Sequence, residues 1–383
     1  MRVYFDNAAT TQIDRAVIEA MLPFMETQYG NPSSTHSHGR EVKVALERAR
    51  KKVASLLGVA PGEIFFTSGG TESDNTAIRC YIEKYKLTHA ITSKLEHHAV
   101  LHTLENLAEN GKVKLSFVEH DDRGNINYDH LEELLNTNQR SLVSLMHGNN
   151  EIGTITNIQR VGDICNEFNA IYHCDTVQTM GYYPMDFSKL PIHAAVGSAH
   201  KFHGPKGIGF LYVDQSRKIH SYLTGGAQER NMRGGTENVI GIIALAKALE
   251  VSFENQEKNQ KHILGLKERM KTQLMDKIAG IDFNGMSGDL ENSVYKVLNV
   301  SLPSGMGNEM LLFNLDLKGI SASGGSACSS GANKGSHVIH AIKPGTDRRS
   351  IRFSFSKFNT AEEIDYAVEQ LVEICQQSTT VPA

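Results

Sequence analysis

The sequence lacks the features that mark membrane-spanning, exported and nucleic-acid-binding chains. Its most apolar run, Val239 to Ala246, is too short to cross a membrane, and Lys247 and Glu250 follow it directly. Residues Met1 to Asn7 have neither the basic start nor the apolar stretch of a signal peptide. Lys and Arg total 39 against 43 Asp and Glu, the formal net charge is -4, and no long basic run occurs. We therefore expect no membrane span, no export and no nucleic-acid partner.

Cysteine pairs and the common nucleotide and metal motifs are also missing. The five cysteines form an odd set without a C-x-x-C pair, which predicts a reducing, cytoplasmic compartment rather than a disulfide framework. Neither the Walker pattern nor G-x-G-x-x-G occurs at residues 67–73 or 204–209, so nucleotide binding has no support. The 17 histidines show neither H-E-x-x-H nor a Cys/His finger spacing, so we expect no metal site.

What is present is the composition of a folded enzyme-sized chain. It has 383 residues, 40% of them hydrophobic and 21% charged, which is typical of globular proteins of two domains. Short apolar, β-branched runs alternate with amphipathic stretches, and this alternation predicts a largely parallel sheet covered by helices. The expected strands lie at residues 64–66, 89–92, 114–118, 142–146, 171–173 and 209–213.

The last third of the chain has a different pattern. A helical pattern runs from Val239 to about Ile278 and predicts a connecting element. Strands are expected near Val294 to Ser301 and Ser350 to Ser354, and a closing helix from Ala361 to Cys375. These elements predict a second, smaller α+β unit.

The segment Thr67 to Ser73, Thr-Ser-Gly-Gly-Thr-Glu-Ser, lies between a predicted strand and a predicted helix. Backbone N–H groups at a helix start favour an anion, so this turn is a candidate phosphate site. Thr71 and Asp74 have the spacing of a capping box. An ordinary turn with a helix cap explains the same residues equally well.

Asp175 and Gln178 follow the buried run 170–174, where open α/β sheets place their ligands. A carboxylate there needs a cationic partner, and the protonated nitrogen of a pyridinium ring would serve, because a nearby negative charge keeps that nitrogen protonated. A helix cap or a salt bridge is the alternative reading of Asp175.

Two further stretches carry candidate nucleophiles. Lys201 lies in Ser198 to Gly207, which is neither a regular helix nor a regular strand, and a partly desolvated lysine there would have a lowered pKa suited to a Schiff base. Lys206 borders a strand and is expected to be structural. Cys328 lies in the Gly/Ser-rich stretch Ser323 to Gly331, where exposure suits a reactive thiol. The remaining cysteines lie in apolar elements and are expected to be structural: Cys80, Cys165, Cys174 and Cys375.

Taken together, these stretches resemble the cysteine desulfurase family of pyridoxal-phosphate enzymes, in the group with a long catalytic-cysteine loop. The resemblance covers nearly the whole chain. Its motifs are YFDNAATT at 4–11, GNPSS at 30–34, GGTES at 69–73, EH at 96–97, NNEIG at 149–153, HCD at 173–175, the segment 198–207, RGGT at 233–236, the Cys328 loop and SIRFS at 350–354.

The resemblance implies a fold type I architecture, with a large cofactor-binding domain at 15–256 and a small domain formed by 1–14 and 257–383. It implies that Lys201 bonds to the cofactor aldehyde, that Asp175 pairs with the ring nitrogen, that Gln178 donates to the ring hydroxyl and that His97 stacks on the ring. Other residues would bind the cofactor phosphate: Gly70, Thr71, Ser198, His200 and, from the second subunit of a homodimer, Thr236.

The implied substrate is L-cysteine, whose carboxylate would bind Arg352 with help from Asn150, a residue that is also expected to contact the cofactor. Lys201 would move the α proton, His97 would carry protons, and Cys328 would accept the sulfur as a persulfide for an acceptor protein in iron–sulfur cluster assembly or another thiolation pathway. Selenocysteine lyase activity on the same scaffold is an alternative. A non-catalytic sulfur-trafficking homologue and a plain aminotransferase or β-eliminase are two others, and in the eliminase Cys328 would be incidental.

Overall fold

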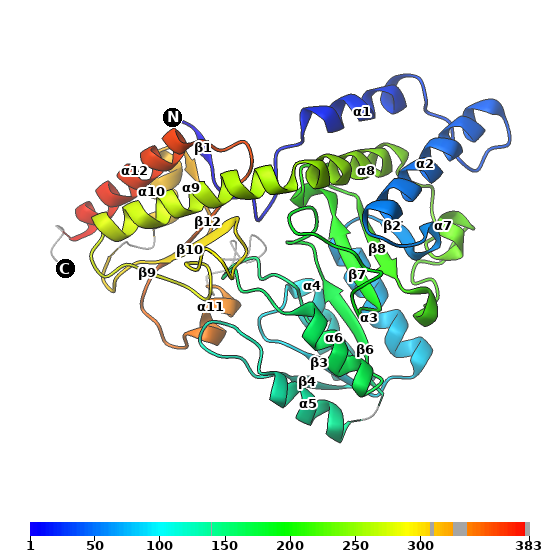
Figure 1. The fold of residues 1–383 in the computed structure, drawn as a ribbon, viewed down its shortest axis with the longest axis horizontal. Helices are drawn as coiled ribbons and strands as arrows, with labels where there is room; N and C mark the ends of the chain where they lie inside the picture. Colours follow the sequence, from blue (N-terminus) through cyan, green and yellow to red (C-terminus); the bar gives the residue numbers. More distant parts are fainter. Residues whose placement is uncertain (139, 307–309, 325–334, 380–383) are drawn as a thin grey trace.

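The structure is a computed structural model that describes residues 1–138, 140–306, 310–324 and 335–379. Figure 1 shows a large sheet with helices on both sides, and beside it a smaller group of strands and helices that contains the C-terminal part of the chain. Within the described ranges, no helix combines the length and the apolar character that crossing a membrane requires.

The large sheet has seven strands in the order β2-β8-β7-β6-β5-β3-β4. Strand β8 is antiparallel to both neighbours and all other pairs are parallel, which confirms the predicted mostly parallel sheet. The six expected strands are present, and a seventh, β7, is additional. The strands are β2 (Ile64–Thr67), β3 (His89–Thr92), β4 (Lys114–Phe117), β5 (Ser141–Ser144), β6 (Ile171–Asp175), β7 (Ala194–Ser198) and β8 (Gly209–Val213).

Helices cover both faces of this sheet because alternate strand residues pack into two separate apolar clusters. On one face, Ile171 packs in a cluster with Ala77 and Val100 of α3 (Gly70–Tyr85) and α4 (His98–Glu109). On the other face, Tyr172 packs in a cluster with Val161. The helices of this second face are α2 (Ser37–Leu56), α5 (Tyr128–Thr137), α6 (Ile158–Glu167) and α8 (Val239–Glu254), with α1 (Arg15–Glu26) against α8.

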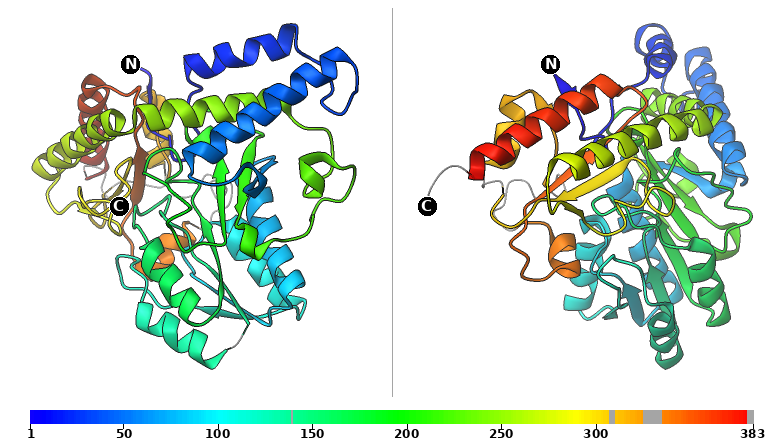
Figure 2. Two further views of the ribbon diagram at one scale, coloured as in Figure 1. Left: turned by 45° about the vertical axis from the view of Figure 1, so that its right-hand side comes forward. Right: turned by 60° about the vertical axis from the view of Figure 1, so that its left-hand side comes forward.

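The predicted helical stretch from Val239 to Ile278 is two helices that meet at Asn255, α8 and α9 (Gln256–Lys277). Figure 2 shows them end to end, with α12 (Ala361–Thr379) alongside α9. The α12 helix extends beyond the expected end at Cys375. The smaller sheets are β12-β10-β9 and β1-β11, from β1 (Val3–Tyr4), β9 (Asp282–Phe283), β10 (Val297–Ser301), β11 (Ile320–Ser321) and β12 (Ser350–Ser354).

The remaining elements are short. Three are α7 (Gln228–Asn231), α10 (Leu311–Leu317) and α11 (His337–Ile342), and three are 3-10 turns at Pro61–Glu63, Ala199–Lys201 and Gln215–Arg217.

The N-terminal segment joins the smaller sheet to the large one. Asn7 donates through Nδ2 to the carbonyl oxygen of Ser354, at 2.8 Å, at the end of β12. The backbone N–H of Thr11 donates to the carbonyl oxygen of His200, at 2.9 Å, in the turn that follows β7. Residues 8 and 9 therefore lie between the two sheets, beside the ends of β6 and β7.

Candidate active site

A cavity of about 230 Å³ lies at this junction. It is lined by most of the residues that the sequence nominated, together with Ala8, Ala9, Asp74, Met146, Gly148 and Val177 from other parts of the chain. The nominated residues in its wall are Gly70, Thr71, His97, Asn150, Asp175, Gln178, Ser198, His200, Lys201 and Arg352. Cys328 lies outside the described residues, and Thr236 lies elsewhere.

Lys201 enters the cavity from the 3-10 turn at Ala199–Lys201, directly after β7. Its Nζ donates to the carbonyl oxygens of Ala8, at 2.7 Å, and Ala9, at 2.8 Å. The carbonyl oxygen of Ala8 also accepts from Nε2 of Gln178, at 3.0 Å. The N-terminal segment thus fixes the position of the amine in the cavity.

Asp175 is the last residue of β6, and its Oδ1 accepts from the backbone N–H of Val177, at 2.9 Å. Burial raises the pKa of this carboxyl group, and the hydrogen bond and the charge of Lys201 act in the opposite direction. A second cation against Asp175 would therefore relieve an unfavourable buried charge.

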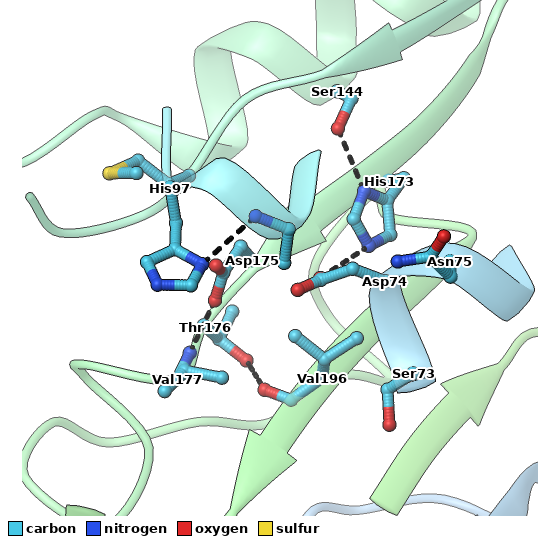
Figure 3. Close-up of polar contacts among 12 residues, drawn as sticks. Ser73, Asp74, Asn75, His97, Ser144, His173, Asp175, Thr176, Val177 and Val196 are labelled. Carbon is cyan, nitrogen blue, oxygen red and sulfur yellow. Dashed lines mark hydrogen bonds and ion pairs between the residues drawn. The ribbon is translucent and has the colours of Figure 1, made fainter. Parts of the chain in front are cut away.

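A second buried carboxyl group, Asp74, lies close to Asp175 and was not nominated as a site residue. Figure 3 shows a line of side chains from Ser144 through His173 to Asp74. His173 contacts the Ser144 hydroxyl at 2.9 Å, and its Nε2 lies 3.3 Å from Oδ1 of Asp74. Burial, and then the charges of Asp175 and Glu96, raise the pKa of Asp74, and burial lowers the pKa of His173 to about 3. Both shifts favour the uncharged forms, a protonated acid beside a neutral imidazole.

The turn before α3 forms one end of the cavity. The helix begins at Gly70, and its N-cap residue, Gly69, makes no side-chain cap, so the capping box expected from Thr71 and Asp74 is wrong. Glu72 instead accepts from the backbone N–H of Ser68, at 2.8 Å. The first backbone N–H groups of a helix have no partner within it, and here they open beside Ser198 and His200. This end of the cavity is suited to a phosphate.

His97 is the N-cap of α4, and its Nδ1 accepts from the backbone N–H of Ala99, at 3.2 Å (Figure 3). Burial lowers the pKa of His97 to about 4, and the charges of Lys201, His337 and His102 add to this effect. The ring is therefore neutral near pH 7. Because Nδ1 accepts a hydrogen bond, the proton of the neutral ring is on Nε2.

Arg352 lies on β12 and lines the same cavity, and its side chain is 1% exposed. One terminal nitrogen donates to Oδ1 of Asp6, at 2.8 Å, and the other to the carbonyl oxygen of Asn150, at 3.1 Å. Its Nε is buried without a hydrogen-bond partner among the described residues. Sequence reasoning missed Asp6, because a contact between residues 6 and 352 leaves no spacing signal.

The other cysteines are unsuited to nucleophilic chemistry, as expected. Cys80, Cys165, Cys174 and Cys375 are free and buried, in α3, α6, β6 and α12. Burial raises the pKa of each thiol, so none is a thiolate near pH 7.

The described residues that precede the Cys328 stretch are close to the cavity, because Ser323 and Arg352 exchange backbone hydrogen bonds.

Thr236 lines a separate cavity of about 170 Å³. Ser68 and Arg233 also line it, so this cavity and the candidate active site adjoin the same turn before α3. Within one chain, the structure does not bring Thr236 together with the other nominated residues.

The residues present fit pyridoxal phosphate. The cavity is lined by a lysine amine, a buried carboxyl group and the first residues of a helix, whose N–H groups are open. Oε1 of Gln178, in the wall of this cavity, is buried and has no partner among the described residues, so it can accept a hydrogen bond from a bound ligand.

Comparison with known proteins places the chain in a family. The model of the family described as aminotransferase class-V matches residues 3–367, and the chain belongs to this family of pyridoxal-phosphate enzymes. Full-length relatives within it are named cysteine desulfurase IscS. That of Dictyoglomus turgidum is 41% identical over 387 residues, covering 99% of this chain and 96% of the relative. That of Methanosarcina thermophila is 42% identical over 380 residues, covering 98% and 92%.

Solved structures agree with this assignment. A NifS-like protein, 38% identical, superposes with a TM-score of 0.90 over 98% of this chain and 100% of the other. The NifS-like protein of Rickettsia africae, 29% identical, gives 0.87 over 98% and 99%. The predicted fold type I architecture, the cofactor and the cysteine desulfurase family are therefore confirmed.

Proposed function

We propose that this protein is a cysteine desulfurase that converts L-cysteine to L-alanine and leaves the sulfur as a persulfide on Cys328. One observation carries the proposal: the amine of Lys201, the carboxyl group of Asp175 and the ring of His97 meet in one cavity that Arg352 also lines. The names of full-length relatives support the same activity.

The cofactor would be held by residues of one cavity. Lys201 would bond to its aldehyde, Asp175 would pair with its ring nitrogen, and His97 would lie against the ring. The start of α3 at Gly70 and Thr71, with Ser198 and His200, would bind its phosphate. When bound, pyridoxal phosphate acts as an electron sink for bonds broken at the substrate α carbon.

The substrate carboxylate would bind at Arg352. The buried Nε of this residue lacks a partner, and Asp6 already shows that a carboxylate fits against the guanidinium. Asn150 is held beside it through its own carbonyl oxygen. A solved structure named SspA in complex with cysteine, 28% identical with a TM-score of 0.79, supports an amino-acid ligand of this size.

The chain supplies the proton carriers and the sulfur acceptor. Lys201 would remove the α proton and later return it, and Nε2 of neutral His97 would donate and accept protons beside it. The Cys328 thiolate would bond to the substrate sulfur as the substrate Cβ–S bond breaks. The electron pair of that bond stays on carbon, where a proton completes the methyl group of alanine.

We also propose a homodimer in which Thr236 completes the phosphate site of the second subunit. Its position outside the cavity of its own chain supports this. In and just after α1, exposed apolar side chains recur at helical spacing and form a stripe suited to a second copy: Ile18, Leu22, Met25 and Tyr29.

Three further proposals concern the domain boundaries, the cellular location and the sulfur acceptor. The large domain at 15–256 is supported by the seven-stranded sheet within it, and the small domain of 1–14 and 257–383 by the pairing of β1 with β11. A cytoplasmic location is supported by the four free cysteines among the described residues. The sulfur acceptor is proposed to be a cluster scaffold or another carrier protein.

The deciding experiment is a cysteine turnover assay that measures alanine and sulfide. Lys201→Ala should abolish both products, and Cys328→Ala should keep the cofactor colour and lose sulfur transfer. Lys206→Ala, at an exposed lysine of the same segment, is the matched control and should retain turnover. Undiminished turnover in Cys328→Ala would favour a β-eliminase, and faster selenide release from selenocysteine would favour the lyase.

A further inference from the structure

A second cavity, of about 400 Å³, lies in the smaller unit of the fold, and the proposed function does not use it. Its charged lining is positive: among the described residues of its wall there is no aspartate or glutamate, and the basic side chains are His340, Lys343, Arg348 and Arg349. Leu312 of α10 supplies part of its apolar wall. This space is the basic cavity.

The chain passes from the candidate active site to the basic cavity within two residues. Ser323 exchanges backbone hydrogen bonds, at 2.6 and 3.2 Å, with Arg352, which lines the active-site cavity. The next residue, Gly324, lines the basic cavity, and a Cβ at this position would lie 3.0 Å from Cδ1 of Leu312. The two cavities therefore adjoin at the point where the chain enters the stretch that contains Cys328.

The chain leaves that stretch at the same border. Gly335 and Ser336 both line the basic cavity. The Ser336 hydroxyl group donates to Oε2 of Glu151, at 2.5 Å, and Glu151 directly follows Asn150 of the active-site wall. The described residues on both sides of Cys328 are thus attached where the two cavities meet.

Position 328 is tethered to this border by a short piece of chain. It is four residues beyond Gly324, and a fully extended chain spans at most about 3.6 Å per residue, or about 14 Å here. A thiol attached at position 328 is therefore within reach of both cavities. A persulfide formed against the substrate in one cavity can be passed on in the other.

The positive charges of the basic cavity are only partly offset by the protein. The guanidinium group of Arg348 donates to the hydroxyl and carbonyl oxygens of Ser301 and to the carbonyl oxygen of Gly280, which are uncharged. Lys343 pairs with Asp282 at 3.2 Å, but the two side chains are 27% and 60% exposed, and such a pair is weak and easily exchanged. The basic cavity therefore favours an anionic partner.

An exposed apolar stripe lies beside the basic cavity, on α10 and the residue before it. Met310, Phe313 and Leu317 have the spacing of one helix face and are 50%, 51% and 69% exposed. Leu312, which lines the cavity, is also exposed. Apolar side chains beside charged groups are typical of protein interfaces. A small anionic thiol would occupy the cavity alone and leave the stripe in water.

We propose that the basic cavity and the α10 stripe form the docking site of the sulfur acceptor, and that the acceptor is a protein whose receiving thiol lies among acidic and apolar side chains. This inference rests on the proposed persulfide on Cys328 and deepens it by naming the chemistry of the partner. The acceptor thiolate bonds to the outer sulfur of the persulfide, the S–S bond breaks, and its electron pair leaves with Cys328 as a thiolate. The proton of the acceptor thiol passes to that thiolate or to solvent, so no oxidant or reductant is required.

The test uses the pyridoxal-phosphate-loaded enzyme, L-cysteine and synthetic peptides that carry a single thiol. Glutamates and leucines flank the cysteine of the acidic peptide, lysines replace the glutamates in the basic peptide, and serines replace the leucines in the polar peptide. Mass spectrometry follows persulfide formation on each peptide, and fluorescence anisotropy measures its binding. Transfer to the acidic peptide should be about tenfold faster than to the other two, and the advantage over the basic peptide should shrink at high salt.

Two variants separate the charge from the apolar contact. Arg349→Glu should lower binding of the acidic peptide and transfer to it about tenfold, and Phe313→Ser about fivefold. Neither residue lines the active-site cavity, so alanine formation with dithiothreitol as the acceptor should be unchanged in both. Where either variant fails to fold, Arg349→Gln or Phe313→Ala should give a smaller loss in the same direction.

Matched control substitutions lie elsewhere on the surface. Lys112→Glu reverses an exposed charge between α4 and β4, and Met275→Ser removes an apolar side chain that is 55% exposed on α9. Both should transfer sulfur to the acidic peptide at the wild-type rate. A loss in these controls equal to that in Arg349→Glu and Phe313→Ser would overturn the assignment of the docking site.

Equal rates for the acidic and basic peptides would also overturn the inference, as would unchanged rates in Arg349→Glu and Phe313→Ser. The same holds if Arg349→Glu slows transfer to mercaptosuccinate, a small anionic thiol, just as much and Phe313→Ser has no effect, because the cavity would then bind a small acceptor. A changed oligomeric state of Phe313→Ser in sedimentation velocity would assign the stripe to a second copy and overturn it too. Wild-type enzyme that forms no persulfide would instead contradict the proposed function, and the anisotropy measurements would still decide whether the acidic peptide docks here.

Discussion

The side-chain nitrogen of Lys201 lies 2.7 Å from the carbonyl oxygen of Ala8. The two residues are far apart in the sequence, and the contact forms because residues 7–11 run between the end of β12 and the turn after β7. Backbone carbonyls hold the amine in place without adding a carboxylate that would lock it in the charged form. The N-terminal segment is therefore part of the candidate active site.

Arg352→Lys should raise KM for cysteine roughly ten- to one-hundredfold and change kcat less, because a lysine cannot reproduce the planar, two-point contact with a carboxylate. Steady-state kinetics of the holoenzyme would show this split. Arg349→Lys is a suitable control, because Arg349 lines a different cavity. A loss confined to kcat would contradict the assigned carboxylate site.

Gly209→Ala should destabilise the protein by about 1–3 kcal/mol and weaken cofactor binding. A Cβ there would lie 2.6 Å from the carbonyl oxygen of Gly197 and 2.7 Å from Cα of Gly69, so the turn that opens α3 would have to move. Gly265→Ala is the control, since its Cβ meets nothing within 4 Å and the position is helical. It should stabilise the protein slightly. Thermal unfolding and cofactor titration would measure both effects, and similar behaviour of the two variants would refute the packing explanation.

Asp74→Asn should become increasingly stabilising relative to the wild type as the pH rises. The pKa of Asp74 is higher in the folded protein than in the unfolded chain. Wild-type stability is therefore lost as the pH rises from the pKa of an ordinary aspartate toward the pKa of Asp74 in the folded protein. The amide mimics the protonated acid and avoids this loss. Unfolding of the cofactor-free protein at acid and alkaline pH would reveal the growing difference. Asp163→Asn, at an exposed site on α6, should show a constant difference. A constant difference for Asp74→Asn as well would mean that folding does not raise the pKa of Asp74, and a difference of the opposite sign would mean that its pair with His173 is ionic.

Arg50→Met should cost about 3–5 kcal/mol of stability, because it leaves the buried Glu229 carboxylate unpaired. The two side chains are 2% and 3% exposed and form two hydrogen bonds, at 2.7 and 2.8 Å. Arg15→Met breaks an exposed pair with Glu19 and should cost under about 1 kcal/mol. Denaturant unfolding would compare the two losses, and equal losses would contradict the burial argument.

The sequence predicted the elements whose signal is local. Strands β3 and β5 are short apolar runs between turn residues, and α3 has an apolar stripe at helical spacing, so neighbouring residues suffice to identify them. Asp175 could be nominated because it ends a buried apolar run at the sheet edge where α/β proteins bind ligands, and Lys201 because it lies in a polar segment with neither a helical nor a strand pattern.

Features that depend on distant residues were missed. Strand β7, with the sequence AAVGS, has mostly small residues and little intrinsic strand preference. It is a strand because β8 packs beside it, and a Cβ at Gly197 would lie 2.2 Å from the Phe210 ring. The pairs Arg352–Asp6 and His173–Asp74 likewise become visible only once the chain is folded.

The central claim is that the cofactor is attached to Lys201, and borohydride reduction of the pyridoxal-phosphate-loaded protein followed by peptide mapping tests it most directly. The account predicts a single stable pyridoxyl group on Lys201 and none after Lys201→Ala. A pyridoxyl group on another lysine such as Lys206 or Lys296, or no incorporation into folded protein, would contradict it.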